Sequence, residues 1–198
     1  MARRIGFLGA VLVTLGTVGC QGRTHTHEWA LMEADASFPE ITGRERPVRR
    51  AGEAAEALEI RRGGNQTVLV ACRVAEDVPA DRPYWHRNLA YVIAIPSPLS
   101  TGTYEVTPEN GRFIENAAWI PARRPYVGLE GRIRVLSLTS RGAVVDCSVR
   151  NVIKRAADPV YPLRGIHTFE FATVDEGVLS GCAIRLDGAA PAPAGPSD

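Results

Sequence analysis

The chain has 198 residues, of which 45% are hydrophobic, 23% charged and 7% aromatic, a composition typical of a folded domain and not of a disordered or disulfide-dense chain. Its length suits one domain of ordinary size with tails. The formal net charge is +1, so composition indicates no basic surface for a nucleic acid, and we expect no nucleic-acid partner.

The first twenty residues, MARRIGFLGAVLVTLGTVGC, have the order of a secretory signal. Arg3 and Arg4 precede an uncharged apolar stretch over residues 5–18. As a helix this stretch would rise about 21 Å, which is shorter than the roughly 30 Å hydrocarbon core of a bilayer, so a permanent span is disfavoured. We therefore predict that residues 1–19 are a signal peptide that is removed on export.

The end of this stretch, Leu15 to Cys20 (LGTVGC), resembles the lipobox of bacterial lipoproteins, in which the cysteine becomes a lipid-modified N-terminus. Thr17 departs from the pattern, because that position is usually aliphatic. The resemblance implies lipidation at Cys20, a membrane partner reached through this lipid, and a place in the cell envelope. Gln21 implies the outer membrane, if the organism has one. Cleavage by an ordinary signal peptidase is the alternative.

Residues 20–50 are predicted to form a lipid anchor and a tether that packs on the domain only in part, for example through Trp29. His25 and His27 carry ligand chemistry, because imidazoles at i and i+2 point the same way on an extended strand, with Glu28 nearby. A metal site at these two histidines is kept as an alternative to a mobile tether. No cofactor is predicted.

A single β-rich domain is predicted over residues 51–186. Its first segment, residues 51–62, is rich in helix formers and ends at two glycines, which favours a short helix. Residues 58–61 could equally begin the first strand. From there the apolar period changes to two, and residues 67–74 and 89–95 each predict a strand that buries one face.

The alternation continues through the rest of the domain. Further strands are predicted over residues 103–107, 131–138, 143–152, 167–172 and 178–186. The second and third of these form a hairpin, whose second arm buries Val145, Cys147 and Val149 and exposes Asp146, Ser148 and Arg150. Seven or eight short strands with little helix predict a mainly β fold, an antiparallel β-sandwich or a partly open barrel. Residues 187–198 are predicted to be a disordered tail.

Three cysteines follow Cys20, and an oxidising envelope would permit a disulfide between two of them. Cys72, Cys147 and Cys182 all lie on apolar faces of predicted strands, so buried small side chains are the simplest interpretation. A bridge between Cys147 and Cys182 is the specific alternative, because both belong to late strands that we expect to be neighbours.

The sequence contains no G-x-S-x-G elbow and no phosphate-binding loop. The candidate binding surface is a run of aromatic and basic residues, Tyr84, Trp85, His86 and Arg87, in a long loop between two buried strands. Trp119 lies in a similar later loop. Both loops could instead use their aromatic rings to cap the core.

These observations predict a lipid-anchored envelope protein with a non-enzymatic binding or structural role, whose partner is an unidentified envelope protein or glycan. One alternative is an envelope hydrolase with a site built from loops, in which a serine or aspartate would contact His86 or His167. Otherwise, His167 is expected to be a core histidine bonded to the backbone. A second alternative is a metal-binding lipoprotein that uses His25 and His27.

Overall fold

The computed structural model describes residues 24–38, 58–75, 87–117, 126–152 and 160–187. In these residues ten strands form one sheet and a single short helix is present. The elements are β1 (Thr24–Ser37), β2 (Leu58–Arg62), β3 (Gln66–Ala75), β4 (Arg87–Pro96), β5 (Gly102–Val106), β6 (Gly111–Ala117), β7 (Tyr126–Thr139), β8 (Gly142–Asn151), β9 (Pro162–Glu170), α1 (Glu176–Gly181) and β10 (Ile184–Asp187). None of the described helical residues form a segment long and apolar enough to cross a membrane.

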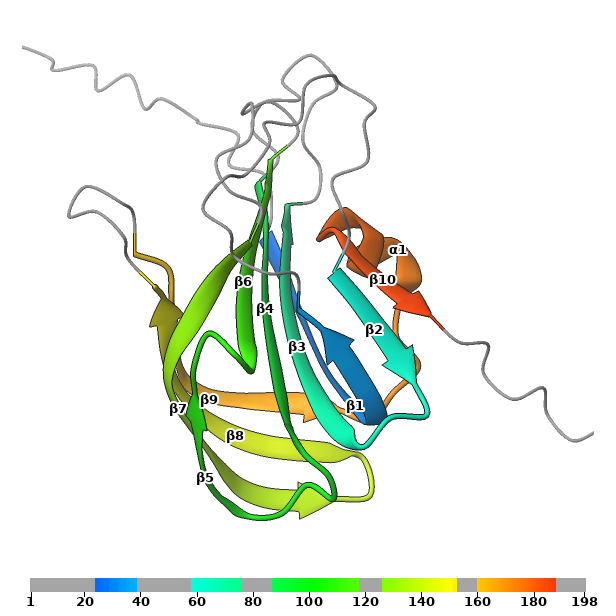
Figure 1. Cartoon of the computed structure of the whole chain (residues 1–198), viewed down its shortest axis with the longest axis vertical. Coiled ribbons are helices and arrows are strands. Elements are labelled where there is room, and N and C mark those ends of the chain that lie inside the picture. Colours follow the sequence, from blue (N-terminus) through cyan, green and yellow to red (C-terminus); the bar gives the residue numbers. More distant parts are fainter. Residues whose placement is uncertain (1–23, 39–57, 76–86, 118–125, 153–159, 188–198) are drawn as a thin grey trace, which may run out of the picture.

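Seven strands close into a barrel (Figure 1). Their order is β1, β3, β4, β6, β7, β8 and β9, and a parallel contact between Trp29 of β1 and Glu170 of β9 completes the ring. β5 pairs with β7 off this path, and β2 and β10 extend the sheet beyond β1. The predicted mainly β fold with little helix is confirmed, in the form of a closed barrel.

The barrel interior is filled by apolar side chains from all seven strands. Tyr91, Phe113 and Phe169 are the largest of them and are almost completely buried. The rings of Tyr91 and Phe113 lie 5.2 Å apart, and Phe113 stacks on Tyr161 at 5.0 Å. A ring of this size is narrow enough for side chains to fill it. A ligand site is therefore expected on the outer face of the barrel or along its seams.

A second apolar core lies outside the barrel, where β2, β10 and α1 cover the sheet (Figure 1). Outward side chains of the barrel, including Trp29, Val70 and Val92, pack there against Leu58 and Leu179. β3 and β4 consequently bury both faces, whereas the sequence predicted one buried face for each. The extra burial arises because β2, α1 and β10 cover the outer face of these strands.

The hairpin of β7 and β8 confirms the predicted alternation. The two strands pair antiparallel along their length. Between positions 145 and 150 of β8, Val145, Cys147 and Val149 are buried and Asp146, Ser148 and Arg150 are exposed. One face of this hairpin therefore belongs to the barrel core and the other is available to solvent.

Residues 58–62 form strand β2, which agrees with the alternative that residues 58–61 begin a strand and not with a helix end. Leu58 and Ile60 at alternate positions enter the second core. Two other segments differ from their predictions. Residues 24–37 form β1 within the sheet and are not a tether. Residues 178–181 belong to α1 and not to a strand, because the Asp175 side chain caps the helix start by accepting two backbone hydrogen bonds.

Two tyrosines provide a matched test of interior packing. The Tyr91 hydroxyl is buried without a hydrogen-bond partner among the described residues, whereas the Tyr104 hydroxyl donates to the Ser100 carbonyl at 2.9 Å. We expect Tyr91→Phe to leave the free energy of unfolding unchanged or raise it by about 1 kcal/mol, and Tyr104→Phe to lower it by about 1 kcal/mol. Urea unfolding measures both, and a larger loss at Tyr91 would contradict the expectation.

Candidate functional site

An open groove of about 490 Å³ lies on the outer face of the barrel. We call it the arginine groove, and its lining residues are Thr103, Arg132, Arg134, Asp146, Cys147, Ser148 and Arg164. It contains three arginines and one carboxylate, so its local charge is positive although the whole chain is near neutral. The Cys147 side chain itself belongs to the barrel interior.

Strand alternation and register assemble this groove. Arg132 and Arg134 are two residues apart in β7 and both face outward, since Ile133 between them is buried. Ser148 of β8 lies opposite Arg132 on one side and opposite Arg164 of β9 on the other. Adjacent strands lie about 4.8 Å apart, so the backbones of the two flanking arginines are roughly 10 Å apart. An anion could contact both guanidinium groups above the serine hydroxyl.

The arginines of the groove form no ion pair with another residue in the described part of the chain, although two carboxylates lie opposite them in register. Asp146 lies opposite Arg134 in register, and Glu105 lies opposite Arg132, yet neither forms an ion pair within 4.0 Å. The next outward-facing pair after Arg132 and Ser148 on β7 and β8 is Glu130 and Arg150, and these two side chains do form an ion pair at 2.8 Å. The groove is therefore a place where an external anion would be favoured.

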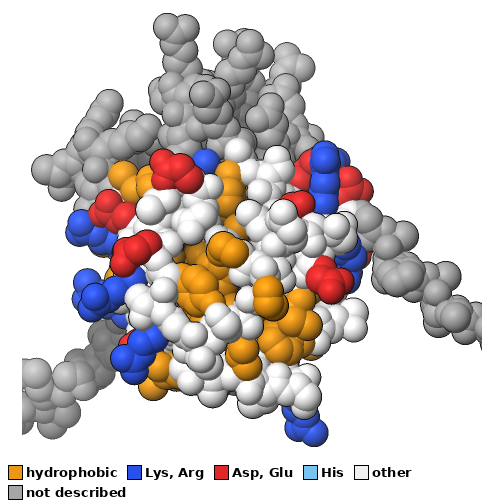
Figure 2. Space-filling view, turned by 60° about the horizontal axis from the view of Figure 1, so that its bottom comes forward, with side chains coloured by type: hydrophobic (Ala, Val, Ile, Leu, Met, Phe, Trp, Pro, Cys, Tyr) orange, Lys and Arg blue, Asp and Glu red, His pale blue; other side chains and the backbone are white. Residues whose placement is uncertain are grey.

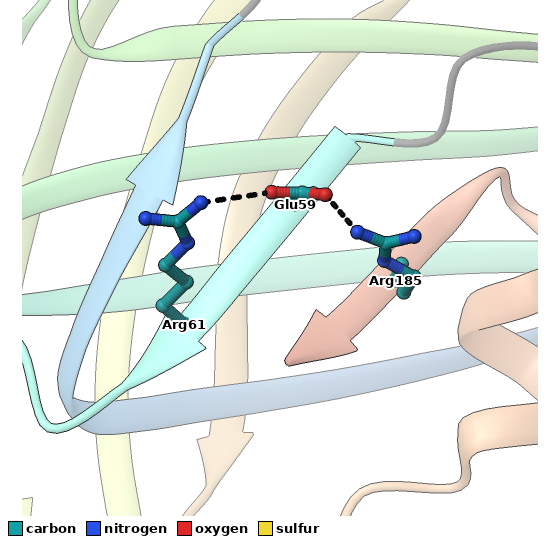
Figure 3. A network of polar contacts seen from close by, with 3 residues as sticks. All are labelled: Glu59, Arg61 and Arg185. Atoms are coloured by element: carbon teal, nitrogen blue, oxygen red, sulfur yellow. Dashed lines mark hydrogen bonds and ion pairs between the residues drawn. The ribbon is translucent and has the colours of Figure 1, made fainter. Parts of the chain in front are cut away.

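At the β2–β10 edge of the sheet, two arginines share one carboxylate. Glu59 of β2 binds Arg61 at 3.4 Å and also binds Arg185 of β10 (Figure 3). Both arginines are largely exposed, so these pairs add little to stability. The pair of Glu59 with Arg185 joins β2 to β10 at the surface.

Exposed apolar surface adds to the groove on one side. Ile166 of β9 lies opposite Asp146 in register and is 69% exposed. Seen from the lower end of the barrel, apolar side chains gather near the centre of the view and charged side chains lie around its margin (Figure 2). A ligand in the arginine groove could thus meet an apolar side chain as well as cations.

The seam between β1 and β9 holds a second polar cluster. Glu28 Oε1 lies 2.6 Å from His167 Nδ1, and Glu28 Oε2 accepts a hydrogen bond from the Thr168 backbone at 3.1 Å. Both side chains of the Glu28–His167 pair are largely buried. Because β1 and β9 share a single backbone pair, this carboxylate supplies further contacts that hold the barrel closed.

Among the described residues, the hydrogen-bond partners of the His167 ring are a carboxylate and a backbone carbonyl. Its Nε2 atom lies 3.2 Å from the Arg164 carbonyl oxygen, and its Nδ1 atom faces Glu28. Neither hydrogen bond reaches a hydroxyl or thiol that the ring could activate, which a hydrolytic triad requires. The expected backbone partner is present, and Glu28 is an additional partner that the sequence did not predict.

Replacing Glu28 by alanine is expected to lower the free energy of unfolding by about 2 kcal/mol, because two hydrogen bonds to a charged group are lost at the seam. Glu105→Ala is the control, since Glu105 is an exposed strand carboxylate without an ion pair in the described residues, and we expect a change below about 0.5 kcal/mol. Denaturant unfolding measures both variants. Equal losses would show that Glu28 does not hold the seam.

The structure places His25 and His27 on β1, on the side of the strand opposite to Glu28. The His27 ring stacks on Trp29 at 5.6 Å. Glu28 therefore cannot join the two imidazoles as the sequence suggested, because successive residues of a strand face opposite ways. Among the described residues no group of three or more His, Cys, Asp or Glu side chains could hold a metal ion.

The predicted bridge between Cys147 and Cys182 is not formed. Cys147 lies in the barrel interior, whereas Cys182 lies in the second core on the outer side of the sheet. Both are free thiols, as is Cys72, which shares the second core with Cys182. Alternation explains the error: both cysteines are buried, as predicted, but in two different cores.

Burial raises the pKa of the Cys147 thiol to about 12, with smaller contributions from Glu28 and Asp146. The native state therefore holds this proton more tightly than the unfolded chain does. Its contribution to stability is complete below the ordinary thiol pKa and is lost as pH rises toward about 12. Between pH 8 and roughly 10.5 we expect the denaturant midpoint of unfolding to fall less for Cys147→Ala than for the parent protein. An equal fall of the midpoint with pH in both proteins would contradict this expectation.

Four of the five residues of the predicted binding surface, Tyr84, Trp85, His86 and Trp119, lie outside the described residues. The predicted lipidation site, Cys20, also lies outside them. The fifth residue of the surface, Arg87, begins β4 directly after residues 76–86, and β6 ends at Ala117, directly before residues 118–125. Arg87 and Ala117 are paired, so these two strand ends lie at the same end of the barrel.

The sequence did not identify the arginine groove, although part of the signal was present. Arg132 and Arg134 stand two apart in a predicted strand, and Ser148 was predicted to face water. Arg164 belongs to β9, and only the register of β8 with β9 brings it to the groove. Comparison with protein-family models, curated proteins and solved structures found no match for this chain.

Proposed function

We propose that the protein is an exported, lipid-anchored binding module of the cell envelope, and that the arginine groove binds an anionic group of an envelope glycan. The leader-like residues 1–20 support the address. The groove supports binding. A non-enzymatic role accords with His167, whose ring nitrogens contact Glu28 and a backbone carbonyl.

The position of β1 suits an N-terminal anchor. Thr24, its first residue, pairs with Ala75 at the end of β3, so β1 begins at the barrel end from which residues 76–86 leave. Cys20 precedes Thr24 by four residues, which span at most about 14 Å when extended. A lipid on Cys20 would therefore hold this end of the barrel close to the membrane surface.

The chemistry of the groove indicates the class of ligand. Guanidinium groups bind carboxylates and phosphates through paired, charge-assisted hydrogen bonds. The hydroxyls of Thr103 and Ser148 and the exposed Ile166 side chain provide the polar and apolar contacts that a sugar ring can use. A glycan that carries carboxylate or phosphate groups fits this combination.

The single observation that carries the binding proposal is that Arg132, Arg134 and Arg164 share one face without an ion pair in the described residues. The test uses the full chain with Cys20→Ser, which cannot take the lipid. Calorimetry would compare oligogalacturonate as the carboxylate source, polyphosphate as the phosphate source and dextran as the neutral control.

We expect binding to at least one of the two anionic polymers, weaker binding at high salt, and no binding to dextran. The preferred polymer distinguishes a carboxylate ligand from a phosphate ligand. Failure to bind either anion, or equal binding to dextran, would exclude the proposed role of the groove.

A further inference from the structure

We infer that Cys72 and Cys182 become joined by a disulfide when the protein folds in an oxidising compartment. The oxidising compartment rests on the proposed export, whereas the choice of partners rests on the structure alone. Such a bridge would attach the C-terminal α1 and β10 covalently to a central barrel strand.

The two thiols meet in the second core. Cys72 lies in β3 opposite Ala90 of β4. The Cys182 sulfur lies 3.9 Å from the carbonyl oxygen of Leu89, the residue next to Ala90. Both cysteines are fully buried in the same apolar cluster. The Cys182 sulfur therefore lies over the strand position beside Cys72.

Cys182 is held in this place by the segment before it. The Asn88 side chain of β4 donates to the Gly181 carbonyl at 2.8 Å. The Cys182 backbone N–H closes α1 by donating to the Leu179 carbonyl at 2.9 Å. The end of α1 is thus fixed to β4 beside the Cys182 thiol, on the side of the sheet to which Cys72 also points.

The pKa of the Cys72 thiol is raised, first by the neighbouring Cys182 side chain and then by burial. This agrees with the place of both thiols in the second core. Folded Cys72 therefore stays protonated and unreactive, because the thiolate is the nucleophile in disulfide chemistry. Oxidation has to occur during folding, before α1 covers β3.

The reaction is a thiol–disulfide exchange with a disulfide-donating oxidoreductase or oxidised glutathione. One cysteine thiolate attacks the donor disulfide and forms a mixed disulfide, and the second thiolate then displaces the donor thiol. The Cys72–Cys182 S–S bond forms, two protons leave, and two electrons reduce the donor disulfide to thiols. Cys147 does not take part, because its side chain lies on the other face of the sheet.

The test is refolding of the full chain with Cys20→Ser. The chain is unfolded in reductant, refolded in a reduced and oxidised glutathione mixture, alkylated and digested. We expect a mass lower by about 2 Da, a linked peptide pair that contains Cys72 and Cys182, and one alkylated cysteine, Cys147. Cys147→Ala should leave the linked pair unchanged, and Cys182→Ala should abolish it.

Three alkylated thiols after refolding, or a linked peptide that contains Cys147, would overturn the inference. The same peptide map on protein isolated from cells separates the pairing from the proposed export. A bridge that forms on refolding but is missing from the cellular protein would support the pairing and count against an oxidising location.

Discussion

Replacing Arg132 and Arg164 together by glutamine is expected to weaken the binding of the preferred anionic polymer by about 100-fold. Each guanidinium group can form a charge-assisted hydrogen bond worth about 1.5 kcal/mol or more, which corresponds to roughly tenfold in affinity. The two residues flank Ser148 on neighbouring strands, so a bound anion would contact both. Calorimetric titration of the double variant measures the loss.

Arg150→Gln is the matched control for this experiment. Arg150 is exposed in β8 on the same face, but Glu130 already neutralises it at 2.8 Å. We expect its replacement to change affinity by no more than about twofold, because exposed ion pairs contribute little. An equal effect of Arg150→Gln would show that binding follows the overall charge of the face and not the arginine groove.

Gly131→Ala is expected to lower the free energy of unfolding by about 3 kcal/mol or more. Gly131 has φ +134°, and a Cβ there would lie 2.2 Å from the Ser148 carbonyl oxygen. Backbone strain and overpacking each cost about 1–3 kcal/mol. The site is sensitive because β7 pairs there with both β5 and β8, at Val106 and Val149.

Gly102→Ala separates the two causes of this loss. Gly102 has φ +150°, but a Cβ at that position would meet nothing within 4 Å. We expect it to cost only about 1 kcal/mol from backbone strain. Denaturant unfolding with circular dichroism compares the variants. If both alanines cost the same, the close approach of β7 to β8 does not limit this position.

The sequence predicted those parts of the fold that depend on local alternation. In β8 every buried and exposed position from Val145 to Arg150 agrees with the period of two, because side chains of neighbouring residues point to opposite faces. The hairpin with β7 was equally local, since its turn contains a glycine between two β-rich runs. The same alternation predicted correctly that Cys182 is buried, but it predicted a strand where the structure has the end of α1.

The closure of the barrel could not be predicted in this way. It depends on one parallel pair between β1 and β9 and on Glu28 meeting His167, residues that are far apart in the chain. No local pattern specifies such a partner. For the same reason, the sequence placed Cys147 and Cys182 together: it showed that both are buried but not on which side of the sheet each lies.

The capped helix was missed for a different reason. The run that ends in β10 alternates like a strand, and this pattern outweighed the helix signal of Asp175 followed by Glu176. Capping of the Gly177 and Val178 N–H groups favours the helical turn locally, and burial of Leu179 in the second core stabilises it. An N-cap residue directly before a run of alternating apolar residues can therefore indicate a short helix even where the alternation predicts a strand.

Mass spectrometry of the N-terminal peptide of the mature protein, isolated from envelope membranes, tests the proposed address most directly. We expect the chain to begin at Cys20 and to carry a diacylglyceryl group on its sulfur, and the Cys20→Ala variant to leave the membrane fraction. An unmodified N-terminus at another residue, or a parent and variant that fractionate identically, would contradict a lipid-anchored envelope module.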